Sequence, residues 1–147
     1  KDEILAEVIN LRLTDKRAML DQWELEGKNP ADRIRNFIKI LILNREKIIR
    51  FGCPLGTLTT ELTKLNHSAQ EDANKLFTLF RSWLAQQFQA LGHKKRADEL
   101  AMHLLARSQG VATLANAFKD EDFIKQEVKY LYGWLDQFTE SFVDREN

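Results

Sequence analysis

The sequence predicts an all-α fold, a bundle of six helices. Apolar residues recur at intervals of three and four along most of the chain, as in Ile34, Phe37, Ile38 and Leu41, and this rhythm is typical of one face of an α-helix. The alternation that marks a strand appears nowhere over a useful length. The two prolines and six glycines fall mostly where the helical pattern breaks. These observations predict helices over roughly 1–25, 30–51, 54–65, 68–91, 95–118 and 121–142.

Turn and capping residues set the first boundaries. Gly27 follows the first helix, Asn29 is placed to cap the second, and Pro30 stands at its first turn, since Asn is a favoured N-cap and Pro is tolerated at the first helical position. Gly52 ends the second helix and Pro54 begins the third, because glycine readily takes the conformation that closes a helix. The stretch FGCPLGTLTTEL, residues 51–62, is therefore at least a corner between two helices.

The later boundaries follow the same chemistry. Ser68 and Glu71 have the spacing of a capping box at the start of the fourth helix. Gly92 ends that helix, and Asp120 is placed to cap the sixth. We see no internal repeat, low-complexity tract or linker, so we expect one domain over residues 1–147.

Composition excludes several classes of protein. With 147 residues, 44% of them hydrophobic and 30% charged, the chain has the composition of a soluble globular protein, and it holds no run of about 18 apolar residues that could cross a membrane. The chain has 22 basic residues (lysine and arginine) and 22 acidic residues (aspartate and glutamate). A chain that binds nucleic acid by itself usually has an excess of basic residues. One cysteine allows no internal disulfide and favours a reducing, cytoplasmic setting.

The fifth predicted helix has two faces that can pack. A broad apolar face serves the core of its own chain. A second stripe contains small residues four apart, which would let another helix approach closely. This stripe comprises His103, Ala106, Gly110, Leu114 and Ala117. The pattern favours a contact with a neighbouring helix or a second subunit.

The last predicted helix is apolar over a wide arc, which is typical of a terminal helix covered on two sides. Leu131, Trp134, Leu135 and Phe138 lie on that arc. Together the last two helices predict the interface of a homodimer. The alternative is a plain six-helix core in which both helices are simply well buried.

Searches for catalytic and metal-binding patterns are negative. His67, His93 and His103 are far apart in the sequence, and no cluster of cysteine and histidine has zinc spacing. A glycine-rich phosphate loop and a nucleophile elbow are also absent. We therefore expect no enzyme activity, no metal and no cofactor.

Two features could carry a different function. Cys53 lies near a helix start, a setting in which thiols react with electrophiles or oxidants, or it is a small apolar residue that fills a corner. Aromatic residues from four successive helices could line an apolar cavity between helices, or each could be an ordinary core residue. They are Trp23, Phe37, Phe51, Phe77, Phe80, Trp83 and Phe88.

Three motifs, in order, point to a known family. The corner FGCPLGTLTTEL contains Gly52-Cys53, Gly56 and Leu58, and LLARSQGVATLANAF, residues 104–118, contains Gln109-Gly110. They match a Gly-Cys-x-x-Gly-x-Leu corner and a Gln-Gly pair, and in this arrangement the chain resembles the C-terminal effector domain of TetR/AcrR-family transcriptional regulators. KDEIL at residues 1–5 is similar to the family's entry into its fourth helix. The likeness covers essentially the whole chain.

The resemblance implies a dimeric, ligand-responsive transcriptional regulator, usually a repressor. The DNA-binding head of three helices would be absent from this chain, which begins at Lys1, and that absence would account for the neutral charge. Operator DNA would be bound only through the absent head. The last two helices would form a four-helix bundle with the same helices of a partner.

The resemblance also implies a pocket among the first five helices for a small apolar or aromatic effector. Gln109 is the polar group expected to orient the effector. The expected lining residues are Phe37, Leu41, Leu58, Phe80, Trp83, Leu84, Leu105 and Gln109. Two alternatives stay open: a helical protein-interaction module without a pocket, and a sensor of electrophiles or oxidants that reacts through Cys53.

Overall fold

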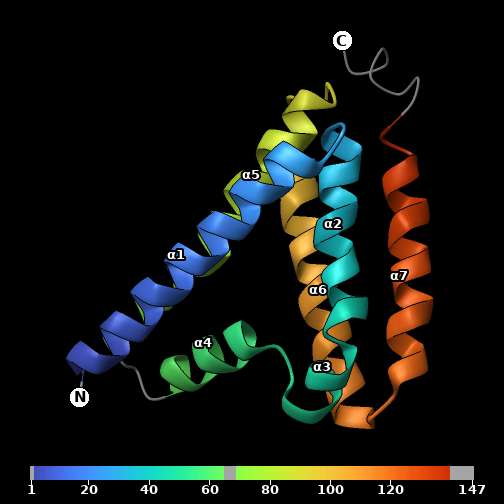
Figure 1. Ribbon diagram of the computed structural model, residues 1–147. Helices are drawn as coiled ribbons and strands as arrows, with labels where there is room; N and C mark the ends of the chain where they lie inside the picture. The colour runs from blue at the N-terminus through green and yellow to red at the C-terminus, as the bar shows by residue number, and fades with distance from the viewer. Residues whose placement is uncertain (1, 65–68, 140–147) are drawn as a thin grey trace.

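The all-α prediction is confirmed. The computed structural model describes residues 2–64 and 69–139, and within these ranges the chain forms seven helices and no strand (Figure 1). The helices are α1 (Asp2–Glu26), α2 (Pro30–Leu43), α3 (Arg45–Phe51), α4 (Pro54–Lys64), α5 (Gln70–Ala90), α6 (Ala97–Phe118) and α7 (Glu121–Asp136).

The predicted caps are present where the structure describes them. The Asn29 side chain accepts a hydrogen bond from the backbone N–H of Asp32 at 2.9 Å, and Asp120 accepts one from Phe123 at 3.0 Å. Each cap satisfies a backbone donor that has no partner inside its helix. The predicted cap Ser68 lies outside the described residues, and α5 begins at Gln70.

The predicted helix 30–51 is two helices, which corrects the count from six to seven. At Asn44 the chain leaves the helical conformation, with φ −103° and ψ 14°, and α3 continues from there. The guanidinium of Arg45 donates to the carbonyl of Ile42 at 2.9 Å, so a backbone acceptor at the end of α2 is satisfied by a side chain. Asparagine is a weak helix former, but no glycine or proline marks the break.

The predicted end of the last helix, at residue 142, is also too late. Helix α7 ends at Asp136, and the backbone N–H of Phe138 donates to Leu135 in a turn at 2.9 Å. Residues 140–147 lie outside the described part of the chain.

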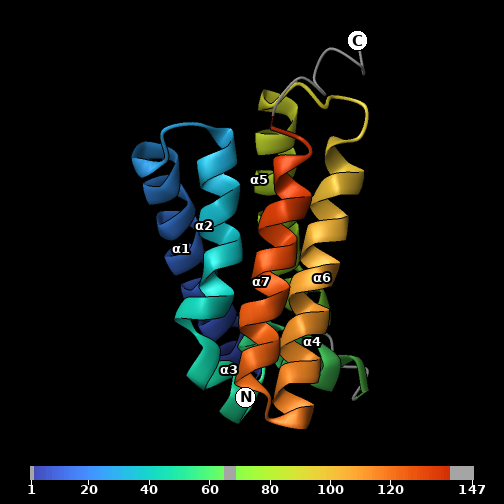
Figure 2. The same ribbon diagram turned by 90° about the vertical axis from the view of Figure 1, so that its right-hand side faces the viewer.

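Helices α2, α6 and α7 run side by side, and α1 runs obliquely to them while packing on α5 (Figures 1 and 2). Helix α3 packs on α6, and α4 packs on α5. The larger core cluster lies among α2, α5, α6 and α7 and includes Ile34, Phe88 and Leu104. A smaller cluster, including Ile9 and Leu62, joins α1, α4 and α5. The two core clusters are separated by a junction, which α1 covers.

Candidate functional site

The corner between α3 and α4 is held closed by side chains of α6. Gly52 has φ 73°, a left-handed conformation that favours glycine, and its N–H donates to Ile48 at 2.8 Å. The amide of Asn116 donates to the carbonyls of Ile48 and Ile49 at 3.2 and 3.0 Å. The ammonium of Lys119 also donates to Ile49, at 2.8 Å. The carbonyls of Ile48 and Ile49 near the end of α3 are thus hydrogen-bonded by side chains at the C-terminal end of α6.

The corner motif and the Gln-Gly motif meet in space, although they lie more than fifty residues apart in sequence. The Gln109 Nε2 donates to the Cys53 Sγ at 3.3 Å. On its other side, Gln109 Oε1 lies against Gly56 so closely that a Cβ at this position would collide with it. The absence of a side chain at Gly56 therefore leaves space for the Gln109 amide, and the hydrogen bond to the Cys53 sulfur fixes the position of that amide.

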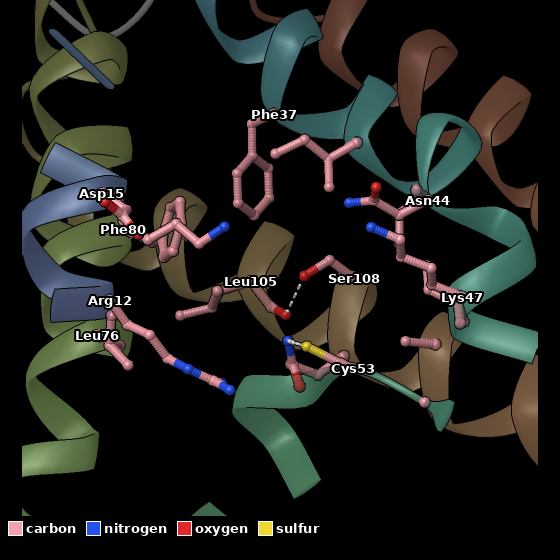
Figure 3. A pocket seen from close by; sticks show the side chains of 17 residues that line it. Arg12, Asp15, Phe37, Asn44, Lys47, Cys53, Leu76, Phe80, Leu105 and Ser108 are labelled. Carbon is pink, nitrogen blue, oxygen red and sulfur yellow. Dashed lines mark hydrogen bonds between the residues drawn. The ribbon is translucent and has the colours of Figure 1, made fainter. Parts of the chain in front are cut away.

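A cavity of about 460 Å³ lies at the junction of the two core clusters. It is lined by residues of α1, α2, α3, α5, α6 and the corner, and its volume suits a drug-sized ligand. Figure 3 shows its labelled side chains converging from these helices. The apolar lining consists mainly of Phe37, Ile40, Leu41, Ile48, Leu76, Phe80, Leu105 and Ala112.

Five of the eight predicted ligand-binding residues line this cavity: Phe37, Leu41, Phe80, Leu105 and Gln109. The rings of Phe37 and Phe80 lie 5.7 Å apart and tilted by 54°.

Trp83 and Leu84 do not line the cavity. Both are core residues, and the ring of Trp83 packs against that of Trp23 at 5.6 Å. The side chain of Leu58 lies outside the described part of the chain.

The polar lining was not predicted from the sequence, apart from Gln109. It consists of Arg12, Asp15, Lys16, Asn44, Lys47 and Ser108. The charged members are exposed on their helices, and a charged residue on an exposed helix face has the sequence pattern of a solvated one. Only the placement of α1 over the junction, and the break at Asn44 that starts α3, bring these side chains to one cavity.

A second cavity, of about 430 Å³, lies on the other side of the corner. Its lining is more polar and includes Thr57, Thr60, Glu61, Thr113 and Asn116. Gly52, Cys53 and Gln109 line both cavities. The hydrogen bond between Gln109 and Cys53 therefore lies in the wall that separates them.

The predicted dimer surface is exposed on α6 and mostly covered on α7. His103, Ala106, Gly110 and Ala117 are exposed, and 47% of Leu114 is accessible. Met102 and Phe118 on α6 and Tyr130 on α7 are also exposed.

Leu131 and Leu135 are core residues of the single chain, each 0% exposed. Their side chains are therefore not accessible for the predicted dimer contact. Trp134 and Phe138 are half-buried, and their rings pack on each other at 5.1 Å. On α7, core packing within the chain accounts for part of the wide apolar arc.

One ion pair with shifted pKa values lies apart from both cavities. Arg81 on α5 donates to both carboxylate oxygens of Asp98 on α6, each at 2.7 Å. This hydrogen bonding lowers the pKa of Asp98 below its ordinary value of 3.8 and raises that of Arg81. The pair joins the two helices at the surface.

The described residues contain no group of three or more His, Cys, Asp or Glu side chains that could hold a metal ion. Among the same residues, no helix is long and apolar enough to span a membrane.

Comparison with known proteins gives one family and one partial similarity. The family model described as the C-terminal domain of LmrA/YxaF-like transcriptional regulators matches residues 30–129. A pyruvate-flavodoxin oxidoreductase from Klebsiella pneumoniae is 30% identical over 61 residues, which cover 42% of this chain and 5% of that protein. The chain thus spans about one twentieth of that curated relative. The family match extends from α2 into α7 and includes the corner, Gln109 and the lining of both cavities except Arg12, Asp15 and Lys16 of α1.

Proposed function

Because the chain belongs to the TetR family of transcriptional regulators, as an LmrA/YxaF-like C-terminal domain, we propose that it is the effector-binding and dimerisation part of a ligand-responsive repressor. The observation that carries this proposal is the cavity of about 460 Å³, with its apolar walls and the Gln109 amide at one side. Such a cavity, apolar with a few convergent polar groups, is the usual form of a small-molecule site.

The position of α1 supports a route from ligand to DNA. Arg12, Asp15 and Lys16 of α1 line the cavity, so a ligand that fills it contacts the helix through which a DNA-binding head would be attached. In a dimer, two heads read successive major grooves about 34–36 Å apart. A ligand that fits only one position of α1 would alter this spacing and release the operator.

The energy that such a switch requires is modest. Moving an equilibrium from 1:99 to 99:1 takes about 5.5 kcal/mol of differential binding. Full burial of an aromatic group stabilises a complex by about 1.5–3 kcal/mol. An effector with two or three groups that are buried in only one of the two states would therefore supply roughly 3–9 kcal/mol, a range that includes this requirement. Phe37, Phe80 and Leu105 provide the apolar contact for such groups.

Filling the cavity tests the proposal. N-phenylnaphthylamine, a neutral dye that fluoresces in apolar sites, should bind the 147-residue chain. Leu105→Trp places a ring in the cavity and should weaken binding at least about tenfold, or about 1.4 kcal/mol. Leu25→Trp, at an exposed position near the end of α1 that lines neither cavity, is the matched control and should leave dye affinity unchanged.

Circular dichroism should show that both variants remain folded, and Ala112→Leu is a smaller filling change at a second lining residue. No dye binding by the parent chain, or equal binding by the parent and both filled variants, would reject the effector site. A helical protein-interaction module without a ligand would then be the better interpretation of this domain.

A second candidate function rests on Cys53. The residue is half-buried, lines both cavities, and its sulfur accepts the hydrogen bond from Gln109. Addition of the thiolate across the double bond of N-ethylmaleimide would form an S–C bond, with the proton taken from water, and would force the Gln109 amide aside. Mass spectrometry should show one adduct on the parent chain and none on Cys53→Ser. An unmodified parent chain at excess reagent would end this candidate.

A further inference from the structure

The lining of the larger cavity carries more positive than negative charge. Arg12, Lys16 and Lys47 line it, and Asp15 is the one carboxylate among its lining residues. The chain as a whole is neutral, with 22 basic and 22 acidic residues. The positive excess is therefore a local feature of this cavity.

The cationic side chains reach the cavity from two sides. Figure 3 shows Arg12 extending from α1 and Lys47 extending from α3 on the opposite side. Arg12 and Lys16 are four residues apart on α1, so they share one face of that helix. Among the described residues, none of the ion pairs includes Arg12, Lys16 or Lys47.

The smaller cavity provides a contrast. Its single charged lining residue is Glu61, and its remaining lining has no cation. Apolar surface and threonine hydroxyls alone would accept a neutral ligand. Two cavities of similar size, separated by Gln109, therefore differ in the sign of their charge.

The apolar and charged parts of the larger cavity are arranged for a ligand with two ends. Phe37, Phe80 and Leu105 form buried apolar walls, while the three cations are exposed residues and keep their heads near water. An apolar body would be buried against these walls. An anionic group would remain at the hydrated rim, where it avoids the large cost of full desolvation.

We propose that the effector is an amphipathic anion, an apolar or aromatic body with a carboxylate or similar acidic group, and that the positive charge of Arg12, Lys16 and Lys47 around the cavity attracts the acidic end. This inference rests on the proposed effector function and narrows its ligand class. Arg12 presents a planar fork that matches a carboxylate. Asn44 and Gln109 supply neutral hydrogen-bonding groups along the wall.

A pair of dyes with nearly the same aromatic skeleton tests this inference. Anilinonaphthalene sulfonate carries an anionic group, and N-phenylnaphthylamine lacks it. Arg12→Gln combined with Lys47→Gln should weaken sulfonate binding by about tenfold and should change the affinity for the neutral dye less than about twofold. Lys39→Gln, an exposed lysine of α2 that lines neither cavity, is the control and should leave both affinities unchanged.

Salt gives an independent readout. Between about 0.01 and 1 M ionic strength the screening length falls from roughly 30 to 3 Å. Sulfonate binding by the parent chain should weaken over this range, and the double variant should lose most of that dependence.

The outcomes separate the two proposals. If the neutral dye binds but the double variant weakens both dyes equally, or neither, the cavity is a ligand site without anion selectivity and the present inference is wrong. If neither dye binds the parent chain, the effector site itself is absent. Thermal unfolding of each variant should show the same folded fraction at the assay temperature, because all three substituted positions, Arg12, Lys39 and Lys47, are exposed.

Discussion

Gln109 is the residue on which the arrangement of the two cavities depends. Its Nε2 donates to Cys53 at 3.3 Å, and its Oε1 lies against Gly56. Because a side-chain amide offers both a donor and an acceptor, this one residue can hold the wall between the cavities and still meet a ligand. Displacing the amide would join two spaces of about 460 and 430 Å³.

Gly56→Ala tests this dependence. The added methyl group collides with Gln109 Oε1 and pushes the amide out of the wall, so affinity for N-phenylnaphthylamine should change at least about threefold. Stability should change little, because alanine is favoured over glycine in a helix by up to about 1 kcal/mol and offsets the collision. Dye titration and thermal unfolding measure the two effects.

Gly133→Ala is the control for this substitution. A Cβ at Gly133 meets nothing within 4 Å, so the change should stabilise the chain by about 0.5–1 kcal/mol and leave dye affinity unaltered. Unchanged dye affinity in Gly56→Ala would mean that Gln109 moves freely and does not maintain the wall.

At this scale the sequence predicted part of the cavity. Phe80, Trp83 and Leu84 lie on the same apolar face of α5, and periodicity identifies that face but not which turn borders an empty space. Only Phe80 borders it. Arg12 and Lys47 could not be found, because their placement depends on the crossing of α1 and on the break before α3 rather than on local pattern.

At the scale of the helices, α6 determines the position of its neighbours through side chains near its C-terminal end. Asn116 donates to two carbonyls of α3, and Lys119 donates to one of them. Arg45 at the start of α3 is ion-paired with Glu121 of α7 at 2.7 Å. The short helix α3, which brings Lys47 to the cavity, is therefore fixed at both ends.

Asn116→Leu should loosen α3. It removes the amide hydrogen bonds to the carbonyls of Ile48 and Ile49, although each carbonyl keeps one other donor. A lost hydrogen bond costs about 0.5–1.5 kcal/mol, so the two together cost about 1–3 kcal/mol. Urea unfolding should show a loss in this range. Asn74→Leu, exposed on α5, should shift stability by less than about 0.5 kcal/mol. Equal losses in the two variants would show that the amide of Asn116 has no special role.

The pair of Arg81 and Asp98 makes the α5–α6 contact sensitive to acid. Hydrogen bonding to Arg81 lowers the pKa of Asp98 in the folded chain below 3.8. The folded state therefore binds the proton more weakly than the unfolded state, and the stabilisation is present above about pH 4 and lost as pH falls through the lowered pKa. Asp98→Asn should be less stable than the parent at pH 7, and the difference should shrink as the pH falls below about 4.

Arg81→Gln should give the same pH dependence, since the two side chains act as one pair. Urea unfolding at several pH values measures both variants. A difference between the parent and Asp98→Asn that stays constant down to pH 2 would contradict the assigned cause.

Helix boundaries were more predictable than the side chains that join the helices. Asn29 and Asp120 act locally, within three residues of the donor they cap, so sequence spacing reveals them. His93 shows the opposite case. It follows Gly92 in a turn, yet only 1% of it is exposed, and its Nε2 lies 2.9 Å from the carbonyl of Phe138, in the turn that follows α7. A contact across 45 residues leaves no local sequence pattern.

At the scale of the whole molecule, the exposed face of α6 lacks an explanation within a single chain. Gly110 is helical and exposed, and a Cβ there would meet nothing within 4 Å. Glycine costs about 1 kcal/mol relative to alanine in such a position. The neighbouring exposed Leu114 and Phe118 extend an apolar surface along the same helix. Close approach of a helix from a second subunit would account for both features.

This proposal predicts that Gly110→Gln separates folding from association. Within one chain the substitution is free of collisions and replaces glycine with a better helix former, so a monomer should gain up to about 1 kcal/mol of stability. In a dimer the longer side chain would separate the two helices and weaken association by at least about tenfold. Sedimentation equilibrium would measure the dissociation constant, with Gln86→Ala, exposed on α5, as the control that leaves it unchanged. A parent chain that sediments as a 17.2 kDa monomer at micromolar concentration, or a Gly110→Gln variant that dimerises as tightly as the parent, would remove α6 from the interface and leave the glycine unexplained.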